Sequence, residues 1–431
     1  ELAMYGDNYE WINHSILPAR IHSHDFRVSV GGPACRKPYS ASVFNISAMS
    51  FGSLSPNAVL ALNEGARRGG FYHDTGEGSL SKYHREPGGD VVWELGSGYF
   101  GACERAGVFS AERFVERAQL DQVKMIEVKL SQGAKPGHGG ILPAAKVSRE
   151  IAETRGVPEG EDCVSPSRHS EFDSPLGLLT FIARLRELSG GKPTGFKLAI
   201  GHPWEWFGIA KAMQESGIRP DFIVVDGAEG GTGAAPMEFI NHVGVPMREG
   251  LLLVHNTLVG LNLREEIRIG AAGKIVSAFD IARTLALGAD WCNAARGFMF
   301  ALGCIQSMSC HTDRCPTGIT TQDPKRWRAL HVPDKAERVF RFHHNTLHAL
   351  KEMIAAAGLE HPGQLGPEHI LRRVSSTKIK SLATLYPQVK PGELLNGTPG
   401  HAVFQRFWAD ARADSFAPPS TLGKLRESKL V

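Results

Sequence analysis

The sequence predicts an α/β fold, namely a (β/α)8 TIM barrel with N- and C-terminal extensions. Strand-like and helix-like segments alternate between residues 42 and 300, which gives roughly seven or eight β-α units and suits one barrel. The run at 221–226 is apolar without alternation, as in a parallel strand buried on both faces. Many of the 48 glycines follow such strands. An open doubly wound sheet is the alternative, but SFGSLSP after the first strand is not its usual glycine motif.

The elements follow from periodicity and from helix-capping residues. The first helix is expected at 55–70, with Ser55 as its cap, Pro56 in its first turn and Gly70 at its end. Further helices are expected at 110–119, 176–189, 204–216, 250–265, 277–287 and 338–357. Strands are expected at 42–50, 122–130, 194–200, 221–226, 267–270 and 291–295, and a short strand that ends in a loop is expected at 71–78. We divide the chain into a leading segment (1–41), the barrel (42–300), a cysteine loop (301–325) and a helical extension (326–431).

Composition excludes several classes of protein. The net charge is +3 and no block of Lys or Arg occurs, which argues against nucleic-acid binding. No apolar run approaches the ~18–20 residues of a membrane span. The 7 cysteines, an odd number, argue for a reducing compartment rather than a disulfide framework. We therefore expect a cytoplasmic protein, with a membrane tether upstream of this chain as the alternative.

Three of the cysteines, Cys304, Cys310 and Cys315, lie in one short segment. Zinc usually takes paired ligands with shorter gaps, whereas three thiolates on one loop suit an iron–sulfur cluster. A fourth ligand from His311, Asp313 or a distant cysteine stays open at this point. The alternative is three buried, inert thiols.

Glycine-rich turns follow several expected strands. The turn at Gly270–Gly273 and the turn that contains Ala295 and Arg296 stand where barrels often bind phosphate. The loop at 227–233 has the glycines that let a backbone approach a flat ring closely. Ordinary turns and a flexible loop are the alternatives.

Polar residues in two further segments are candidates for the site. Gln132, Lys135 and His138 follow the strand at 122–130, where Lys135 suits a carboxylate partner and Gln132 a hydrogen bond. Lys197 lies inside an apolar strand, so it faces either solvent or a buried anion.

The ordered combination of these segments resembles the family of FMN-binding glutamate synthase-like proteins. The resemblance runs from about residue 42 to residue 324. It rests on SAMSFGSLS (47–55), DTGEG (74–78), KLSQGAKPGHGG (129–140), the Lys197 strand, GAEGGTGAAP (227–236) and GCIQSMSCHTDRCPTGITTQDP (303–324).

The resemblance implies two cofactors, FMN and a 3Fe-4S cluster. It implies that Cys304, Cys310 and Cys315 ligate the cluster and that Lys197 faces the pyrimidine side of the flavin. It further assigns Ala48, Met49, Ser50, Gly76, Gly231, Thr232 and Gly233 to the flavin, Gly270, Gly273, Ala295 and Arg296 to its phosphate, and Gln132, Lys135 and His138 to the substrate side.

The implied reaction is reductive amination by a glutamate synthase-type oxidoreductase. Electrons would come from a donor such as ferredoxin or a reductase subunit, and reduced FMN would transfer a hydride to 2-iminoglutarate, formed from 2-oxoglutarate and ammonia. The resemblance covers no glutaminase region, so we expect free ammonia or an ammonia-supplying subunit. Assembly into an oligomer stays open.

The sequence also departs from the long glutamate synthases. His138 stands where those enzymes typically carry Glu, and the segment 163–172 differs as well. Both flank the expected substrate. Two alternatives follow, a related flavoenzyme for another oxo acid or amine, such as an N-alkyl glutamate synthase, and an electron-transfer subunit of a larger complex.

Overall fold

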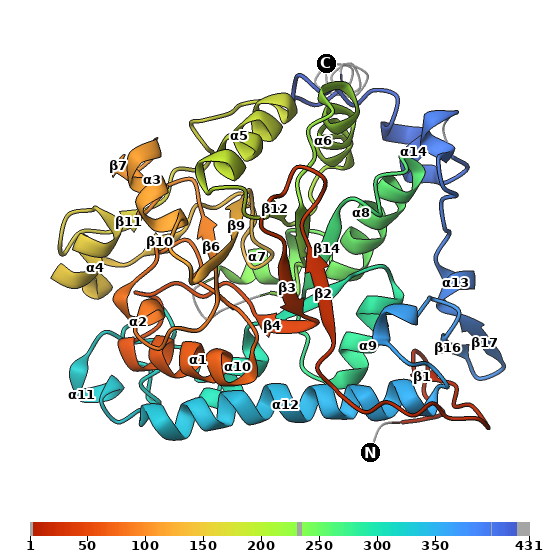
Figure 1. Cartoon of the computed structure of the whole chain (residues 1–431), viewed down its shortest axis with the longest axis horizontal. Helices are drawn as coiled ribbons and strands as arrows, with labels where there is room; N and C mark the ends of the chain where they lie inside the picture. Colours follow the sequence, from red (N-terminus) through yellow and green to blue (C-terminus); the bar gives the residue numbers. More distant parts are fainter. Residues whose placement is uncertain (1–2, 231–234, 398, 420–431) are drawn as a thin grey trace.

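Eight parallel strands close into a barrel at the centre of the molecule (Figure 1). The computed structural model describes residues 3–230, 235–397 and 399–419. Each barrel strand pairs with the next one along the chain, and the last pairs with the first. In chain order they are β4 (Phe44–Ile46), β5 (His73–Asp74), β6 (Val91–Leu95), β9 (Val123–Lys129), β12 (Thr194–Leu198), β13 (Phe222–Asp226), β14 (Arg268–Ala272) and β15 (Trp291–Ala294). The predicted (β/α)8 fold is therefore confirmed.

Helices follow the barrel strands and surround them (Figure 1). In α1 (Pro56–Gly69), Ser55 caps the first turn by accepting a hydrogen bond from the Ala58 N–H, and Gly70 ends the helix in the left-handed conformation, as predicted. The other strands lead to α2 (Lys82–Arg85), α3 (Ala111–Ala118), α5 (Pro175–Leu188), α6 (Pro203–Ser216), α8 (Met247–Gly260), α9 (Ala278–Ala286) and α10 (Arg296–Leu302).

One barrel strand does not follow from the sequence pattern. The strand β6 was not predicted, although every residue of its sequence VVWEL is buried. Its run is short and includes Glu94, so periodicity gave no strand signal there. The segment 71–78, predicted as a short strand that ends in a loop, forms the two-residue strand β5, after which the chain turns into a loop at Thr75.

Side chains from alternate strand positions fill the barrel interior in layers. We call the apolar layer near the N-terminal ends of the strands the lower layer. It contains Tyr72, Val92, Met125, Phe222, Val224 and Trp291. The hairpin of β2 (Arg27–Val30) and β3 (Tyr39–Ser42) contributes Val30, Tyr39 and Ala41 to the same cluster. The leading segment therefore closes this end of the barrel and leaves the other end for the site.

The terminal extensions pack onto the barrel. The helix α12 (Val332–Ala356) runs along one side of the molecule, against α1, α9 and α10 (Figure 1). Near its end, β1 (Glu10–Ile12) pairs with β16 (Ile370–Ser375), which in turn pairs with β17 (Lys378–Ser381). Among the residues that the structure describes, no helix is both long and apolar enough to cross a membrane.

Candidate active site

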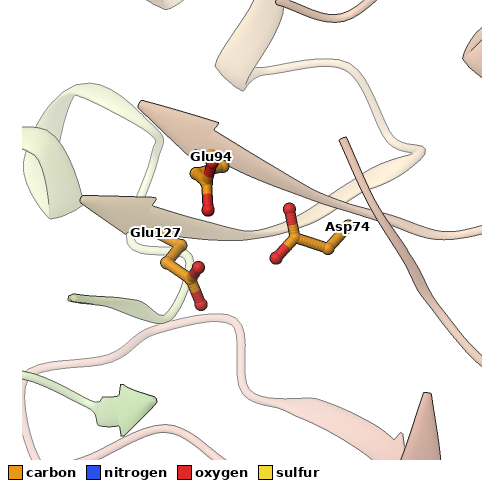
Figure 2. A group of neighbouring side chains, drawn as sticks. All are labelled: Asp74, Glu94 and Glu127. Carbon is orange, nitrogen blue, oxygen red and sulfur yellow. The ribbon is translucent and has the colours of Figure 1, made fainter. Parts of the chain in front are cut away.

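A second interior layer, which we call the charged layer, lies near the C-terminal ends of the strands. It consists of Asp74, Glu94, Glu127, Lys197 and Asp226, from β5, β6, β9, β12 and β13. The carboxylates of Asp74, Glu94 and Glu127 point toward one another (Figure 2), with one oxygen of each within 4.8 Å of the others. The Lys197 ammonium donates to Glu94 and lies 3.5 Å from a Glu127 oxygen.

The charged layer holds more carboxylates than cations. Burial and the nearby Glu94 carboxylate together raise the pKa of Asp74 to about 7, against the opposing effect of Lys197. Burial and Asp74 likewise raise the pKa of Glu127. Burial alone would lower the pKa of Lys197, but the surrounding carboxylates outweigh it and raise that pKa. Lys197 is therefore a permanent cation, and Asp74, with its pKa of about 7, retains its proton in part of the molecules at neutral pH.

Above this layer, Lys129 at the end of β9 joins two loops. Its ammonium lies 2.9 Å from a Glu77 oxygen and donates to the Gln132 side-chain oxygen at 3.0 Å. The Ser165 hydroxyl also donates to Glu77, at 3.2 Å. Burial opposes ionisation of Glu77, but Lys129 holds the pKa of that carboxyl at about 2. The rim of the barrel thus carries a fixed negative charge beside a fixed positive one.

His169 completes the rim. One of its ring nitrogens is 2.9 Å from the Tyr99 hydroxyl and the other is 2.8 Å from the Lys129 carbonyl oxygen. Burial lowers the pKa of His169 to about 4, so its ring is neutral at pH 7. A small cavity of about 60 Å³ lies here, and its lining includes Glu77, Lys129, Gln132, His138 and His169.

The predicted substrate residues meet this cavity in different ways. Gln132 and His138 line it, whereas Lys135 does not. Lys135 is half-buried, and burial lowers its pKa while Glu77 opposes that change. Among the described residues the buried amide nitrogen of Gln132 has no hydrogen-bond partner, which is costly unless a ligand accepts from it.

The residues predicted to lie along a flavin ring come from two loops that touch. Ala48, Met49 and Ser50 follow β4 and are half-buried. Gly76 follows β5 with φ +63°, and a Cβ there would lie 2.7 Å from the Ser50 amide nitrogen. This close backbone approach requires glycine. The predicted residues Gly231, Thr232 and Gly233 lie outside the described residues.

The late glycine turns divide into two environments. Gly270 lies within the strand β14 rather than in a turn, and a Cβ there would lie 2.6 Å from the Trp291 ring in the lower layer. Its lack of a side chain is explained by that contact. Gly273 follows the end of β14, and Ala295 and Arg296 begin α10 just after β15. These three therefore lie at the C-terminal ends of neighbouring strands.

The cysteine loop follows α10 and is joined to the loop after β4. Gln322 donates to the carbonyl oxygens of Gly52 and Leu54 at 3.0 and 2.8 Å. The Ser55 N–H donates to the Ile319 carbonyl at 2.8 Å. Since Gly52 lies two positions after Ser50, the loop with the candidate cluster ligands contacts the loop with the candidate flavin residues.

The thiols of this loop are suited to bind metal. Cys304, Cys310 and Cys315 form no disulfide. Burial would raise the pKa of Cys315, but hydrogen bonds from Thr317 and Thr320 lower it to about 7, which favours the thiolate. Three thiols on one loop are the donor set that a 3Fe-4S cluster requires, so these residues fit that group.

Several charged or titratable residues of the site, Asp226 among them, are not indicated as site residues by the sequence. Asp74, Glu77, Glu94, Glu127, Lys129 and His169 converge only in the barrel. Some signal was present, because Glu77 and Lys129 lie inside the quoted motifs. Alternation along QVKMIEVKL also puts Glu127 and Lys129 on one face of β9.

Comparison with known proteins agrees with this geometry. Residues 32–360 match the family model described as the conserved region in glutamate synthase. The glutamate synthase large subunit-like protein YerD of Bacillus subtilis is 43% identical over 86% of this chain and 70% of its own length. The archaeal-type glutamate synthase (NADPH) of Thermotoga maritima is 36% identical, over 76% of this chain and 62% of that protein.

Solved structures show the same fold at low identity. A mandelate oxidase variant with (S)-mandelic acid has a TM-score of 0.51 at 14% identity and covers 86% of each chain. A flavocytochrome b2 variant with sulfite bound has a TM-score of 0.50 at 12% identity, over 90% of this chain and 80% of that one.

The relatives are longer than the part that this chain matches. The chain spans 58% of the archaeal glutamate synthase (NADPH) of Methanocaldococcus jannaschii, to which it is 36% identical over 73% of its own length. The family match nevertheless covers the whole barrel and the whole cysteine loop. On this combination of barrel, charged site and sequence similarity, the chain belongs to the glutamate synthase family and is an oxidoreductase.

Proposed function

We propose that the chain is an FMN- and 3Fe-4S-dependent glutamate synthase-type enzyme. It reduces 2-iminoglutarate, formed from 2-oxoglutarate and ammonia, to glutamate. The observation that carries this proposal is the rim of the barrel, where the Gln132 amide nitrogen, which has no partner among the described residues, lies beside the Lys129–Glu77 pair and above the charged layer. Residues 42–300 are then the FMN-binding barrel and 301–325 the cluster loop.

The rim residues account for binding of a dicarboxylic oxo acid. Lys129 offers a cation for a carboxylate from the cavity lining, Lys135 offers a second one from outside that lining, and the Gln132 amide nitrogen donates a hydrogen bond to the same ligand. Glu77, ionised because its pKa is about 2, accepts hydrogen bonds from the nitrogen that ammonia contributes. The neutral His169 holds the Lys129 carbonyl and so fixes the end of β9.

The cofactors would be held by residues around this rim. When bound, FMN supplies hydride transfer and the cluster supplies single electrons. Lys197 fits beside the flavin as a permanent cation, with Ala48, Met49, Ser50 and Gly76 along the ring and Gly273, Ala295 and Arg296 at the phosphate. Cys304, Cys310 and Cys315 are the proposed cluster ligands. A ferredoxin or a reductase subunit would donate the electrons, and ammonia would come from solution or from another subunit.

Turnover under anaerobic conditions tests the reaction. With a reduced dye or ferredoxin, 2-oxoglutarate and ammonium, we expect glutamate to form. Gln132→Ala should raise the KM for 2-oxoglutarate at least tenfold, about 1.4 kcal/mol of lost binding. Gln119→Ala, at the exposed end of α3, is the matched control. No glutamate above a flavin-free sample would refute the proposal.

Iron analysis tests the cluster separately. Cys310→Ser should remove the iron and the brown absorbance while FMN is retained. Cys35→Ser, which changes a half-buried free thiol far along the chain, should retain both. Unchanged iron in Cys310→Ser would contradict the ligand assignment.

A second candidate function keeps the cofactors and changes the acceptor. His138 lines the cavity and its ring meets Phe239 edge-on at 4.5 Å between centroids. This aromatic wall would favour a bulkier oxo acid or an N-alkyl amine over ammonia. A screen of acceptors by flavin reoxidation distinguishes the two, and His138→Glu should move the preference toward 2-oxoglutarate and ammonium. Equal preference in both proteins would argue against this candidate.

A further inference from the structure

A buried lysine that the sequence analysis did not single out lies against the cysteine loop. Lys146, at the end of the short 3-10 helix Ala144–Lys146, is only 2% exposed. Its ammonium donates to the carbonyl oxygens of Ser53, Cys310 and Thr320 at 3.2, 2.7 and 2.9 Å. One side chain thus contacts the loop after β4 and two points of the cysteine loop.

The Lys146 ammonium has three hydrogen-bond acceptors, but no carboxylate of the described residues forms an ion pair with it. All three acceptors are neutral carbonyls, and none of the ion pairs found within the described ranges includes Lys146. By contrast, the buried Lys197 and Arg186 each pair with a carboxylate. A buried cation without a counter-ion is costly, so a nearby anion is expected.

Lys192 is a second buried lysine, and its charge is balanced by a helix end. It is also buried and donates only to carbonyls, those of Ala118 and Leu120 at 2.6 and 2.7 Å. Those oxygens lie at the C-terminal end of α3, whose dipole supplies negative potential. The acceptors of Lys146 lie in loops. Burial lowers the pKa of Lys146 to about 8, and the charge of Asp313 opposes that change.

We propose that Lys146 is the counter-ion of the anionic iron–sulfur cluster, an inference that rests on the cluster assignment in the proposed function. Three ferric ions nearly balance four sulfides, so three thiolates leave the whole group negative, and one added electron makes it more negative. A fixed ammonium beside Cys310 stabilises both states and the reduced state more. Lys146 therefore raises the reduction potential of the cluster and favours its acceptance of an electron.

The same contacts make Lys146 a positioning residue. Its bond to Ser53 fixes the cysteine loop against the loop that continues from the candidate flavin residues Ala48–Ser50. It also anchors the segment that leads away from the substrate rim through β10 (Ile141–Leu142). One buried cation thus ties together the loops proposed for the cluster, the flavin and the substrate.

A redox titration of the holoprotein tests the charge. The cluster is followed by electron paramagnetic resonance and the flavin by visible absorbance in the same sample. Lys146→Met should lower the one-electron equilibrium for cluster reduction at least tenfold, which is about 59 mV, and leave the flavin potential unchanged. Lys146→Arg, which keeps the charge, should stay near the wild type. Lys192→Met is the control for loss of a buried lysine elsewhere.

A cluster-loaded Lys146→Met protein with the wild-type cluster potential would overturn the inference. If Lys146→Met does not retain iron, Lys146→Arg decides. If Lys146→Arg retains iron and has the wild-type cluster potential, the counter-ion role of Lys146 is supported. If Lys146→Arg also loses iron, that role is overturned. Absence of iron from the wild type would instead contradict the cluster in the proposed function.

Discussion

The lower layer and the charged layer come from the same barrel strands, but one consists of uncharged side chains and the other of carboxylates and a lysine. Met125 and Glu127 are two positions apart on β9, as Val92 and Glu94 are on β6, and each pair contributes one residue to each layer. The lower layer is closed by the β2–β3 hairpin and contains only uncharged side chains. The charged layer faces the open rim with its carboxylates around one lysine.

This difference shows how one sheet combines stability and chemistry. Moving two residues along a strand keeps a side chain inside the barrel and changes its neighbours from packed apolar groups to charges. The lower layer stabilises the folded state because it buries apolar side chains. The charged layer buries charged groups, which cost stability but are available for binding and catalysis. Substitutions in each layer should therefore fail for different reasons.

The largest effect is expected for Lys197→Met in the charged layer. Removing the cation leaves Glu94 and Glu127 buried without it, so the free energy of unfolding should fall by about 3–5 kcal/mol. Urea denaturation at pH 7 measures this. The double variant Lys197→Met/Glu94→Gln should recover part of the loss, and a single variant as stable as the wild type would contradict the role of the pair.

Next in size is the pH dependence that Asp74 adds. Its folded pKa of about 7 lies above the unfolded value near 3.8, so its contribution to stability is full below pH ~4 and is lost as pH rises through ~7. Between pH ~4 and ~7 the free energy of unfolding of the wild type should therefore fall by an amount on the order of 2–4 kcal/mol. In Asp74→Asn this fall should be absent. Denaturation at several pH values measures it. The exposed Asp121→Asn should leave the slope unchanged, and an unchanged slope in Asp74→Asn would refute the assignment.

A smaller effect is expected in the lower layer for Gly270→Ala. The added Cβ would meet the Trp291 ring at 2.6 Å, so overpacking should cost about 1–3 kcal/mol of stability. FMN affinity, measured by fluorescence quenching, should not change if Gly270 serves packing alone. Gly400→Ala, where the new Cβ meets nothing within 4 Å, is the control. A selective loss of FMN affinity would restore the predicted phosphate role.

The smallest effect is expected for an ion pair outside the barrel. Arg149 and Glu153 pair at 3.0 Å on an exposed helix face. Solvent screens such a pair, so Arg149→Ala should not change the urea midpoint beyond the error of measurement. A loss comparable to that of Lys197→Met would show that burial is not what separates the two pairs.

Much of the fold could be predicted because its signals are local. Capping at Ser55 and Gly70, and the apolar run of β13, each depend on neighbours in sequence. The strand β6 escaped prediction because Glu94 interrupts a short apolar run, and only its place inside the barrel explains a buried carboxylate there. Gly270 was assigned to a turn because its partner, Trp291, belongs to the next strand.

The candidate site divides in the same way. Gln132, His138 and the three cysteines were predicted from motifs, since each motif is a continuous segment. The contacts of Lys129 with Glu77, and of Lys146 with Ser53 and Thr320, join residues far apart in the chain. No local pattern indicates such partners.

The sequence by itself determined the barrel, the family and the segments that carry the chemistry. Periodicity, caps and motif spacing are properties of neighbouring residues, so they can be read before folding. Only the tertiary structure decided which interior positions are charged together, what surrounds Lys197, and that Lys146 lies against the cysteine loop with no ion-pair partner in the part of the chain that the structure describes. Strand register and loop packing set these contacts, because they bring distant charges into one water-poor interior where each needs a partner.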